Sequence, residues 1–165
     1  MPFARTLVMG NSGSGKSWMA ERLAASTGAP WVDLDHIFWK PGGYNVARDK
    51  AQASAMLAAA AAQPGWVIEG IYGALLRQAQ ARAGALIWLS IDEAECAANI
   101  AQRGVRRGGN ADSLAALLAW TTSYRSRDGS SSFGAHQALF NGFSGAKVCL
   151  SSRDEMAAFI ATLPP

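Results

Sequence analysis

The chain of 165 residues has the length of a single domain, and half of its residues are hydrophobic, which is enough for a buried core. Its net charge of +3 favours anionic ligands and permits, without indicating, a nucleic-acid partner. Two widely separated cysteines exclude a disulfide framework. The sequence shows no signal peptide and no stretch fit to span a bilayer, so we expect a cytoplasmic protein with no membrane partner.

The first predicted elements are a strand over residues 6–9, a glycine-rich loop and a helix over residues 16–26. The loop has the spacing G-x-x-x-x-G-K-S and consists of Gly10, Asn11, Ser12, Gly13, Ser14, Gly15, Lys16 and Ser17. Its glycines let backbone N–H groups turn inward, and the helix adds the positive end of its dipole. We expect it to bind ATP, with Lys16 at the β and γ phosphates and Ser17 on Mg²⁺. The alternative is a glycine-rich turn that binds nothing.

The next predicted elements are a strand over residues 31–35, a helix over 46–63, a strand over 66–69, a helix over 74–82 and a strand over 85–91. Asp92 caps the following helix, and Asp112 caps another that extends to residue 124. A polar loop through residue 132, a strand over 146–150 and a helix over 154–163 complete the chain. The alternation predicts an α/β three-layer sandwich with a five-stranded parallel sheet, whose strands end at one ligand-binding edge.

Four carboxylates fall at or just after predicted strand ends: Asp33, Asp35, Glu69 and Asp92. Mg²⁺ takes one or two carboxylates, so the four cannot all be its ligands, and Asp92 is expected to be a helix cap. Asp33 and Asp35 would share one face of a strand. We expect Ser17 with Asp33 or Glu69 to hold the metal and Asp35 to orient the acceptor hydroxyl. A solvated turn is the alternative for the aspartate pair.

Arginines form a second group of candidates, with a single carboxylate, Asp112, to balance them. Guanidinium groups can meet the equatorial oxygens of a transferring phosphoryl group in a bidentate manner. The alternative is a solvated charged surface. Between residues 99 and 127 the chain carries Arg103, Arg106, Arg107, Arg125 and Arg127, of which Arg103, Arg107 and Arg125 are the predicted catalytic residues.

The chain resembles P-loop kinases of the nucleoside monophosphate kinase class, and most closely the bacterial adenylate kinase-like group labelled DNA topology modulation proteins, related to FlaR. The resemblance covers nearly the whole chain and rests on residues 10–17, on L-D-H-I-F-W-K-P-G at 34–42, on V-I-E-G-I-Y at 67–72 and on residues 103–107. It implies a sheet order of 2-3-1-4-5, an acceptor-binding insertion at about 36–64 and a short lid at about 104–128, all within one kinase domain, 1–165.

The resemblance also implies roles for single residues. Glu69 occupies the Walker B place, and Asp33 and Asp35 are similar to the D-x-D of shikimate and gluconate kinases. Arg153, with the two serines before it, would flank adenine. The lid lacks the zinc-type cysteines of some adenylate kinases, and Arg48 is the only arginine of the acceptor segment, which disfavours AMP as acceptor.

Two functions follow. The first is an ATP- and Mg²⁺-dependent phosphotransferase that acts on a nucleotide or another small molecule. The second, from the label of the group, is a nucleotide-gated regulatory protein that affects DNA topology. This alternative needs a continuous basic face, and the modest charge argues against one.

Overall fold

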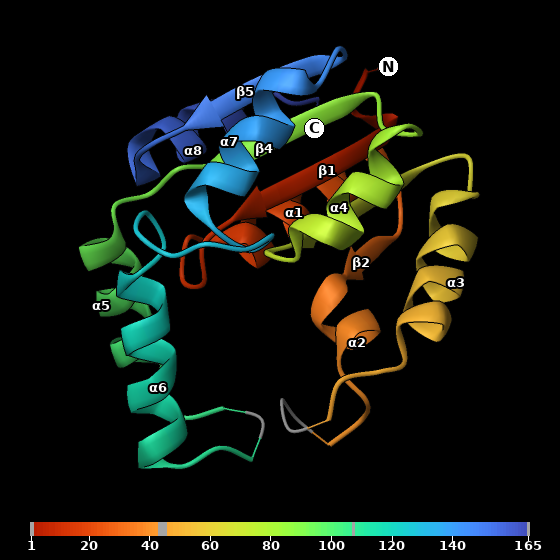
Figure 1. The fold of residues 1–165 in the computed structure, drawn as a ribbon. Coiled ribbons are helices and arrows are strands. Elements are labelled where there is room, and N and C mark those ends of the chain that lie inside the picture. The colour runs from red at the N-terminus through yellow and green to blue at the C-terminus, as the bar shows by residue number, and fades with distance from the viewer. Residues whose placement is uncertain (1, 43–45, 107, 165) are drawn as a thin grey trace.

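The computed structural model describes residues 2–42, 46–106 and 108–164 (Figure 1). Its centre is one sheet of five parallel strands in the order β2-β3-β1-β4-β5. The strands are β1 (Arg5–Gly10), β2 (Trp31–Asp33), β3 (Trp66–Gly70), β4 (Ala85–Leu89) and β5 (Ala146–Leu150). The α/β sandwich and the 2-3-1-4-5 order expected from the sequence are therefore confirmed.

Helices cover both faces of this sheet, as Figure 1 shows. After a short 3-10 turn at Pro2–Ala4, they are α1 (Lys16–Thr27), α2 (Leu34–Phe38), α3 (Lys50–Ala61), α4 (Gly73–Gln80), α5 (Glu93–Arg103), α6 (Ala111–Thr122), α7 (Phe133–Gly142) and α8 (Arg153–Ala161). In the described ranges of the chain, none of these helices is both long and apolar enough to cross a membrane.

The core has two halves because successive side chains of a strand point to opposite faces. Leu7 and Met9 of β1 pack on one face with residues of α3, α4 and α7. Val8, between them, packs on the other face with residues of α1, α5 and α8. The central strands β1, β3 and β4 are thus buried on both sides.

The second strand is shorter than the sequence predicts. β2 ends at Asp33, whose carboxylate accepts a hydrogen bond from the backbone N–H of Asp35 at 2.8 Å and caps α2. Asp35 therefore lies in the first turn of a helix, and the prediction that Asp33 and Asp35 share one face of a strand was wrong. The strand ends early because the Asp33 side chain caps α2 instead of continuing β2.

Other differences also come from caps. The helix predicted over 46–63 begins at Lys50, because Asp49 caps it, while Trp39 and Ala47 pair as an antiparallel bridge. The predicted cap at Asp112 was wrong, since Asn110 caps α6 in a reciprocal capping box. Helix α7 was not predicted, and its N-cap is Ser132. Asp92 caps α5 as expected.

A buried hydrogen-bonded network joins the end of α6 to β4, α7 and the loop after β3. His136 Nε2 lies 2.8 Å from the Ile71 carbonyl oxygen, which can only accept, so Nε2 carries the proton. Nδ1 then accepts from the Tyr124 hydroxyl at 2.6 Å, and that oxygen accepts from Trp88 Nε1 at 3.2 Å. Burial lowers the pKa of His136 to about 4, although its bond to Ile71 opposes the shift.

This network makes a prediction for stability at acid pH. Unfolded His136 protonates near its ordinary pKa of 6.5, whereas the folded protein resists protonation until about pH 4. The stability it contributes is therefore present above pH 6.5 and is lost as pH falls, by up to about 3 kcal/mol. The difference in unfolding free energy between wild type and His136→Gln, measured by denaturant titration, should shrink by that amount from pH 7 to pH 4.

The matched control is His36→Gln, because His36 is exposed. Its difference from wild type should stay nearly constant over the same pH range. A constant difference for His136→Gln as well would contradict the neutral, buried assignment of this histidine.

Candidate functional site

The P-loop, residues 10–17, leaves β1 and enters α1 through two glycines in the left-handed region. Gly13 has φ 73° and Gly15 has φ 93°. A Cβ atom on Gly13 would lie 2.4 Å from the Cys96 carbonyl oxygen of α5, and one on Gly15 would lie 2.9 Å from Met156 Cε of α8. Gly15 is also the N-cap of α1, and no side chain caps this helix. The loop is thus a tight cradle at an uncapped helix N-terminus, which suits an anion.

One atom of this cradle is a buried polar group without a partner. Among the residues that the structure describes, Ser14 Oγ is the buried side-chain oxygen that makes no hydrogen bond. Leaving such a hydroxyl unsatisfied costs about 1–3 kcal/mol, and an oxygen-rich ligand would supply the missing partner. The residues present therefore fit a bound polyphosphate.

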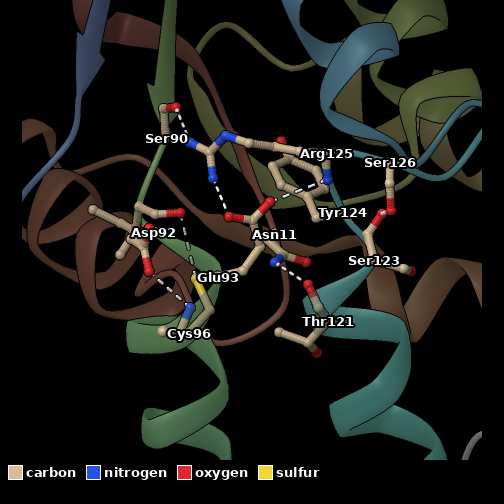
Figure 2. Close-up of polar contacts among 12 residues, drawn as sticks. Asn11, Ser90, Asp92, Glu93, Cys96, Thr121, Ser123, Tyr124, Arg125 and Ser126 are labelled. Carbon is tan, nitrogen blue, oxygen red and sulfur yellow. Dashed lines mark hydrogen bonds and ion pairs between the residues drawn. The ribbon is translucent and has the colours of Figure 1, made fainter.

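The loop lysine and the lid are connected through Asn11. Lys16 Nζ donates to the Asn11 carbonyl oxygen at 2.7 Å. The buried Asn11 side chain donates to the Thr121 carbonyl oxygen at the end of α6, at 2.9 Å, as Figure 2 shows. Asn11 was predicted to bind the nucleotide, and the structure turns its side chain toward α6. Its main chain still belongs to the cradle.

Glu69 lies directly beneath the P-loop helix. It follows Ile68 in β3 and pairs in register with Val8 of β1 and Asp33 of β2. Its Oε1 accepts a hydrogen bond from Ser17 Oγ at 2.8 Å, and its exposed fraction is 2%. Burial raises the pKa of Glu69 to about 7, while the positive charge of Lys16 opposes the rise.

The predicted metal ligands lie close together around this carboxylate. Asp33 and Asp35 each raise the pKa of Glu69 through their negative charge, so all three acids share one local field with Lys16. In residues 2–42, 46–106 and 108–164, no three histidine, cysteine or acidic side chains form a cluster that could hold a metal by themselves. Mg²⁺ needs no such cluster, because it usually keeps waters and takes substrate phosphates with one or two carboxylates. Ser17 with Glu69 or Asp33 fits that requirement.

Asp35 faces a separate cavity of about 730 Å³ between the segment after β2 and the lid. The lining residues are Asp35, His36, Trp39, Lys40, Pro41, Gly42, Arg48 and Gly108. Two hydrogen bonds hold Asp35 in place. Its backbone N–H donates to the Asp33 carboxylate, and the Tyr72 hydroxyl donates to Asp35 Oδ1 at 2.6 Å. The cavity therefore has room for a small molecule beside Asp35.

Arg48 has a structural contact in this cavity. Its Nε donates to the Ile37 carbonyl oxygen at 3.0 Å, and its Nη2 lies 3.2 Å from that of His36 and 3.3 Å from that of Trp39. These are carbonyl groups at the end of α2, which lack partners inside the helix. The guanidinium thus stabilises the segment that carries Asp35.

Two of the candidate arginines, Arg125 and Arg127, contact groups around α5 and α6. Arg125 pairs with Glu93 and reaches Ser90 Oγ at 3.4 Å (Figure 2). Arg127 stacks on Trp120 with 3.6 Å from Cζ to the ring centroid. The exposed Arg103 ends α5, and the predicted site residue Arg107 lies outside the described residues. Their contact with phosphate stays a prediction.

Arg153 is connected to the P-loop through one side chain. Its Nη2 donates to Asn99 Oδ1 at 2.7 Å, and Asn99 Nδ2 donates to the Gly13 carbonyl oxygen at 2.9 Å. Glu95 lies 3.4 Å from Arg153 Nε. Asn99 and Tyr72 are the residues that sequence reasoning did not assign to the site. In the sequence, Tyr72 follows Gly70 by two residues, and this closeness to Glu69 was the feature that could have indicated a place in the site.

The fold of this chain is that of P-loop kinases. A gluconokinase from Sinorhizobium meliloti 1021 is 17% identical over 96% of this chain and 91% of its own, with a TM-score of 0.57. Shikimate kinase from Acinetobacter baumannii, in complex with shikimate, is 13% identical over 96% and 89%, with a TM-score of 0.59. Shikimate kinase from Bacteroides thetaiotaomicron is 14% identical over 96% and 94%, with a TM-score of 0.51.

No family model matches the sequence, and a search of curated proteins finds no match. At these identities the likeness to the three kinases shows the fold alone. The resemblance to DNA topology modulation proteins stays an interpretation of the sequence.

The cradle predicts a difference between two glycines of similar backbone conformation. Gly13 and Gly28 have φ of 73° and 68°, so alanine is strained at both, but a Cβ on Gly28 meets nothing within 4 Å. Gly13→Ala should lower the free energy of unfolding by about 1–3 kcal/mol more than Gly28→Ala, because of the contact with Cys96. Calorimetry should show weaker Mg-ATP binding in Gly13→Ala only. Equal effects of the two substitutions would contradict the cradle geometry.

Buried Glu69 predicts a pH effect of opposite sign to that of His136. Its pKa rises from an ordinary value of 4.5 to about 7 on folding, so ionisation between these values favours the unfolded state. Without ligands, wild type should lose up to about 3 kcal/mol of stability relative to Glu69→Gln as pH rises from 5 to 8. Thermal unfolding over this range measures it, with the exposed Glu21→Gln as control. A difference that does not depend on pH would show that Glu69 ionises normally.

Proposed function

We propose that this protein is an ATP- and Mg²⁺-dependent phosphotransferase that acts on a small molecule with a hydroxyl or phosphate group. The observation that carries the proposal is the arrangement of two neighbouring sites. The P-loop presents Lys16 and the Ser17–Glu69 pair, and the cavity presents Asp35, which is near enough for its charge to act on Glu69. A phosphate donor and an acceptor can thus be held next to each other, which is the main requirement for phosphoryl transfer.

The residues of the chain have separable tasks in this proposal. The P-loop amides and Lys16 bind the β and γ phosphates, and Arg153 flanks the nucleotide through its link to the P-loop. When bound, Mg²⁺ neutralises phosphate charge, and Ser17 with Glu69 or Asp33 would hold it. Asp35 accepts a hydrogen bond from the acceptor hydroxyl. This bond directs the hydroxyl oxygen of the acceptor toward the γ-phosphorus.

Transfer is in line. The bond from the acceptor oxygen to the γ-phosphorus forms as the bond to the bridging oxygen of ADP breaks, and the hydroxyl proton passes toward Asp35. Arg103, Arg107 and Arg125 are proposed to stabilise the charge of the transition state as the lid, at about 104–128, closes. The insertion at about 36–64 would bind the acceptor. We place this reaction in the cytoplasm.

The class of acceptor is supported by three points. The gluconokinase and the shikimate kinases of similar fold are named for hydroxylated acids. The cavity holds both a carboxylate and the side chain of Lys40. Arg48, the only arginine in the sequence between the second and third strands, bonds main-chain oxygens. We therefore favour a hydroxylated small molecule over AMP.

The DNA-related alternative lacks a specific observation in its favour. It needs a continuous basic face, and Glu93 and Glu95 neutralise Arg125 and Arg153. Binding to duplex DNA with a steep salt dependence would support it against the kinase.

The direct test is a screen of purified protein with Mg-ATP against hydroxylated acids, sugars, nucleosides and nucleoside monophosphates, read by ADP release. A compound that raises ADP release above the rate with water, and gains one phosphate by mass spectrometry, identifies the acceptor. Absence of both ATP binding and ADP release would reject the proposal.

Lys16→Ala is expected to lower turnover at least about a hundredfold, because it removes the point charge at the phosphates. The fold should persist, since the hydrogen bond of Lys16 Nζ goes to a main-chain oxygen of the P-loop itself, at Asn11. ADP release and far-UV circular dichroism measure the two effects. Arg82→Ala, at an exposed position between α4 and β4, is the control and should keep wild-type turnover. Turnover of Lys16→Ala equal to wild type would remove the P-loop from the mechanism.

A further inference from the structure

Three side chains form a hydrogen-bonded chain that ends on Asp35, the residue proposed to orient the acceptor hydroxyl. Trp39 Nε1 donates to the Tyr72 hydroxyl oxygen at 2.8 Å, and this hydroxyl donates to Asp35 Oδ1 at 2.6 Å. Asp35 and Trp39 belong to α2 and its C-cap, whereas Tyr72 follows β3 and caps α4. The chain therefore connects two segments more than thirty residues apart in sequence.

The direction of these hydrogen bonds is fixed by chemistry. An indole N–H can only donate, so the Tyr72 oxygen is the acceptor for Trp39. The single phenolic proton is then directed to Asp35, and Oδ1 must accept it. This hydrogen bond therefore fixes the position of the Asp35 carboxyl group at the cavity that Asp35 lines.

The ring of Tyr72 is also held in place. It stacks on Phe38, with ring centroids 4.2 Å apart and planes 6° from parallel. Phe38 in turn makes an edge contact with Trp39, with centroids 4.8 Å apart. Both donors of the chain are thus oriented by ring packing, so the hydroxyl stays aimed at Asp35 without relying on the acceptor.

We propose that Tyr72 is a positioning residue: it holds the carboxyl group of Asp35 oriented in the acceptor cavity, and Trp39 orients Tyr72. The inference rests on the phosphotransferase function proposed above and adds a residue to it. Tyr72 does not touch the transferred group in this account. It acts through Asp35, and the loss of its hydroxyl should lower turnover while ATP binding is retained.

The test is a double-mutant cycle with Mg-ATP hydrolysis as the readout, where water occupies the place of the acceptor hydroxyl. Tyr72→Phe keeps the ring stacked on Phe38 and removes only the hydroxyl. It should lower kcat about ten- to a hundredfold with KM for ATP nearly unchanged. Asp35→Asn should lower kcat at least as much. The double variant should be no slower than Asp35→Asn alone, since Tyr72 has no effect without the carboxylate.

Tyr124→Phe is the matched control. It also removes only a phenolic hydroxyl, but the partners of that hydroxyl are the side chains of Trp88 and His136. Its effect, of whatever size, should multiply with that of Asp35→Asn, as expected for separate sites.

Three results would overturn the inference: an unchanged kcat in Tyr72→Phe, an unchanged kcat in Asp35→Asn, or losses of these two variants that multiply in the double variant. Each presupposes that wild type binds and hydrolyses Mg-ATP. If wild type does neither, the proposed phosphotransferase function fails, and the positioning role fails with it. The two failures are therefore distinguished by the wild-type measurement.

Discussion

The hydrogen bond from Ser17 to Glu69 is the contact on which the site depends. It forms only because β1 and β3 are neighbours, in register at Val8 and Glu69, and because α1 begins immediately after the left-handed Gly15. A buried carboxylate is costly unless it is paired or hydrogen-bonded. The positive charge of Lys16 reduces that cost. The sheet order, the tight loop and the polar pair are thus parts of one arrangement.

Two buried titratable groups near this arrangement have pKa values shifted in opposite directions. Glu69 lies under the P-loop with a pKa raised to about 7, and His136 supports the loop after β3 with a pKa lowered to about 4. Burial is the main cause in both cases, and in both it favours the neutral form. Their contributions to stability change with pH in opposite directions over nearly the same range, so they partly cancel in the intact protein.

The sequence predicted the parts of the site that are local or set by topology. The P-loop is defined by eight consecutive residues, and Glu69 and Asp33 meet because the ends of parallel strands share an edge. The rest depends on contacts between distant segments. Nothing near Tyr72 in sequence shows that its hydroxyl reaches Asp35. Nor does the sequence show that His136 bonds Tyr124, because that contact depends on how α7 packs. Asp33 shows a third limit, because a cap and a strand residue look alike in sequence.

The arginines show how strength of contact separates structural from functional side chains. Arg48 is held by three main-chain oxygens, and Arg127 also bonds main-chain oxygens, so both are committed to the fold. Arg125 pairs with Glu93 in a contact where 41% of the arginine side chain is exposed. The Glu93 side chain is only 16% exposed, and the guanidinium also lies 4.8 Å from the centroid of the Phe133 ring, so this pair is more firmly held than a fully exposed one, which contributes about 0–1 kcal/mol. A polyphosphate carries more charge than one carboxylate and could still take this guanidinium from Glu93, whereas it could not take Arg48 without exposing the end of α2.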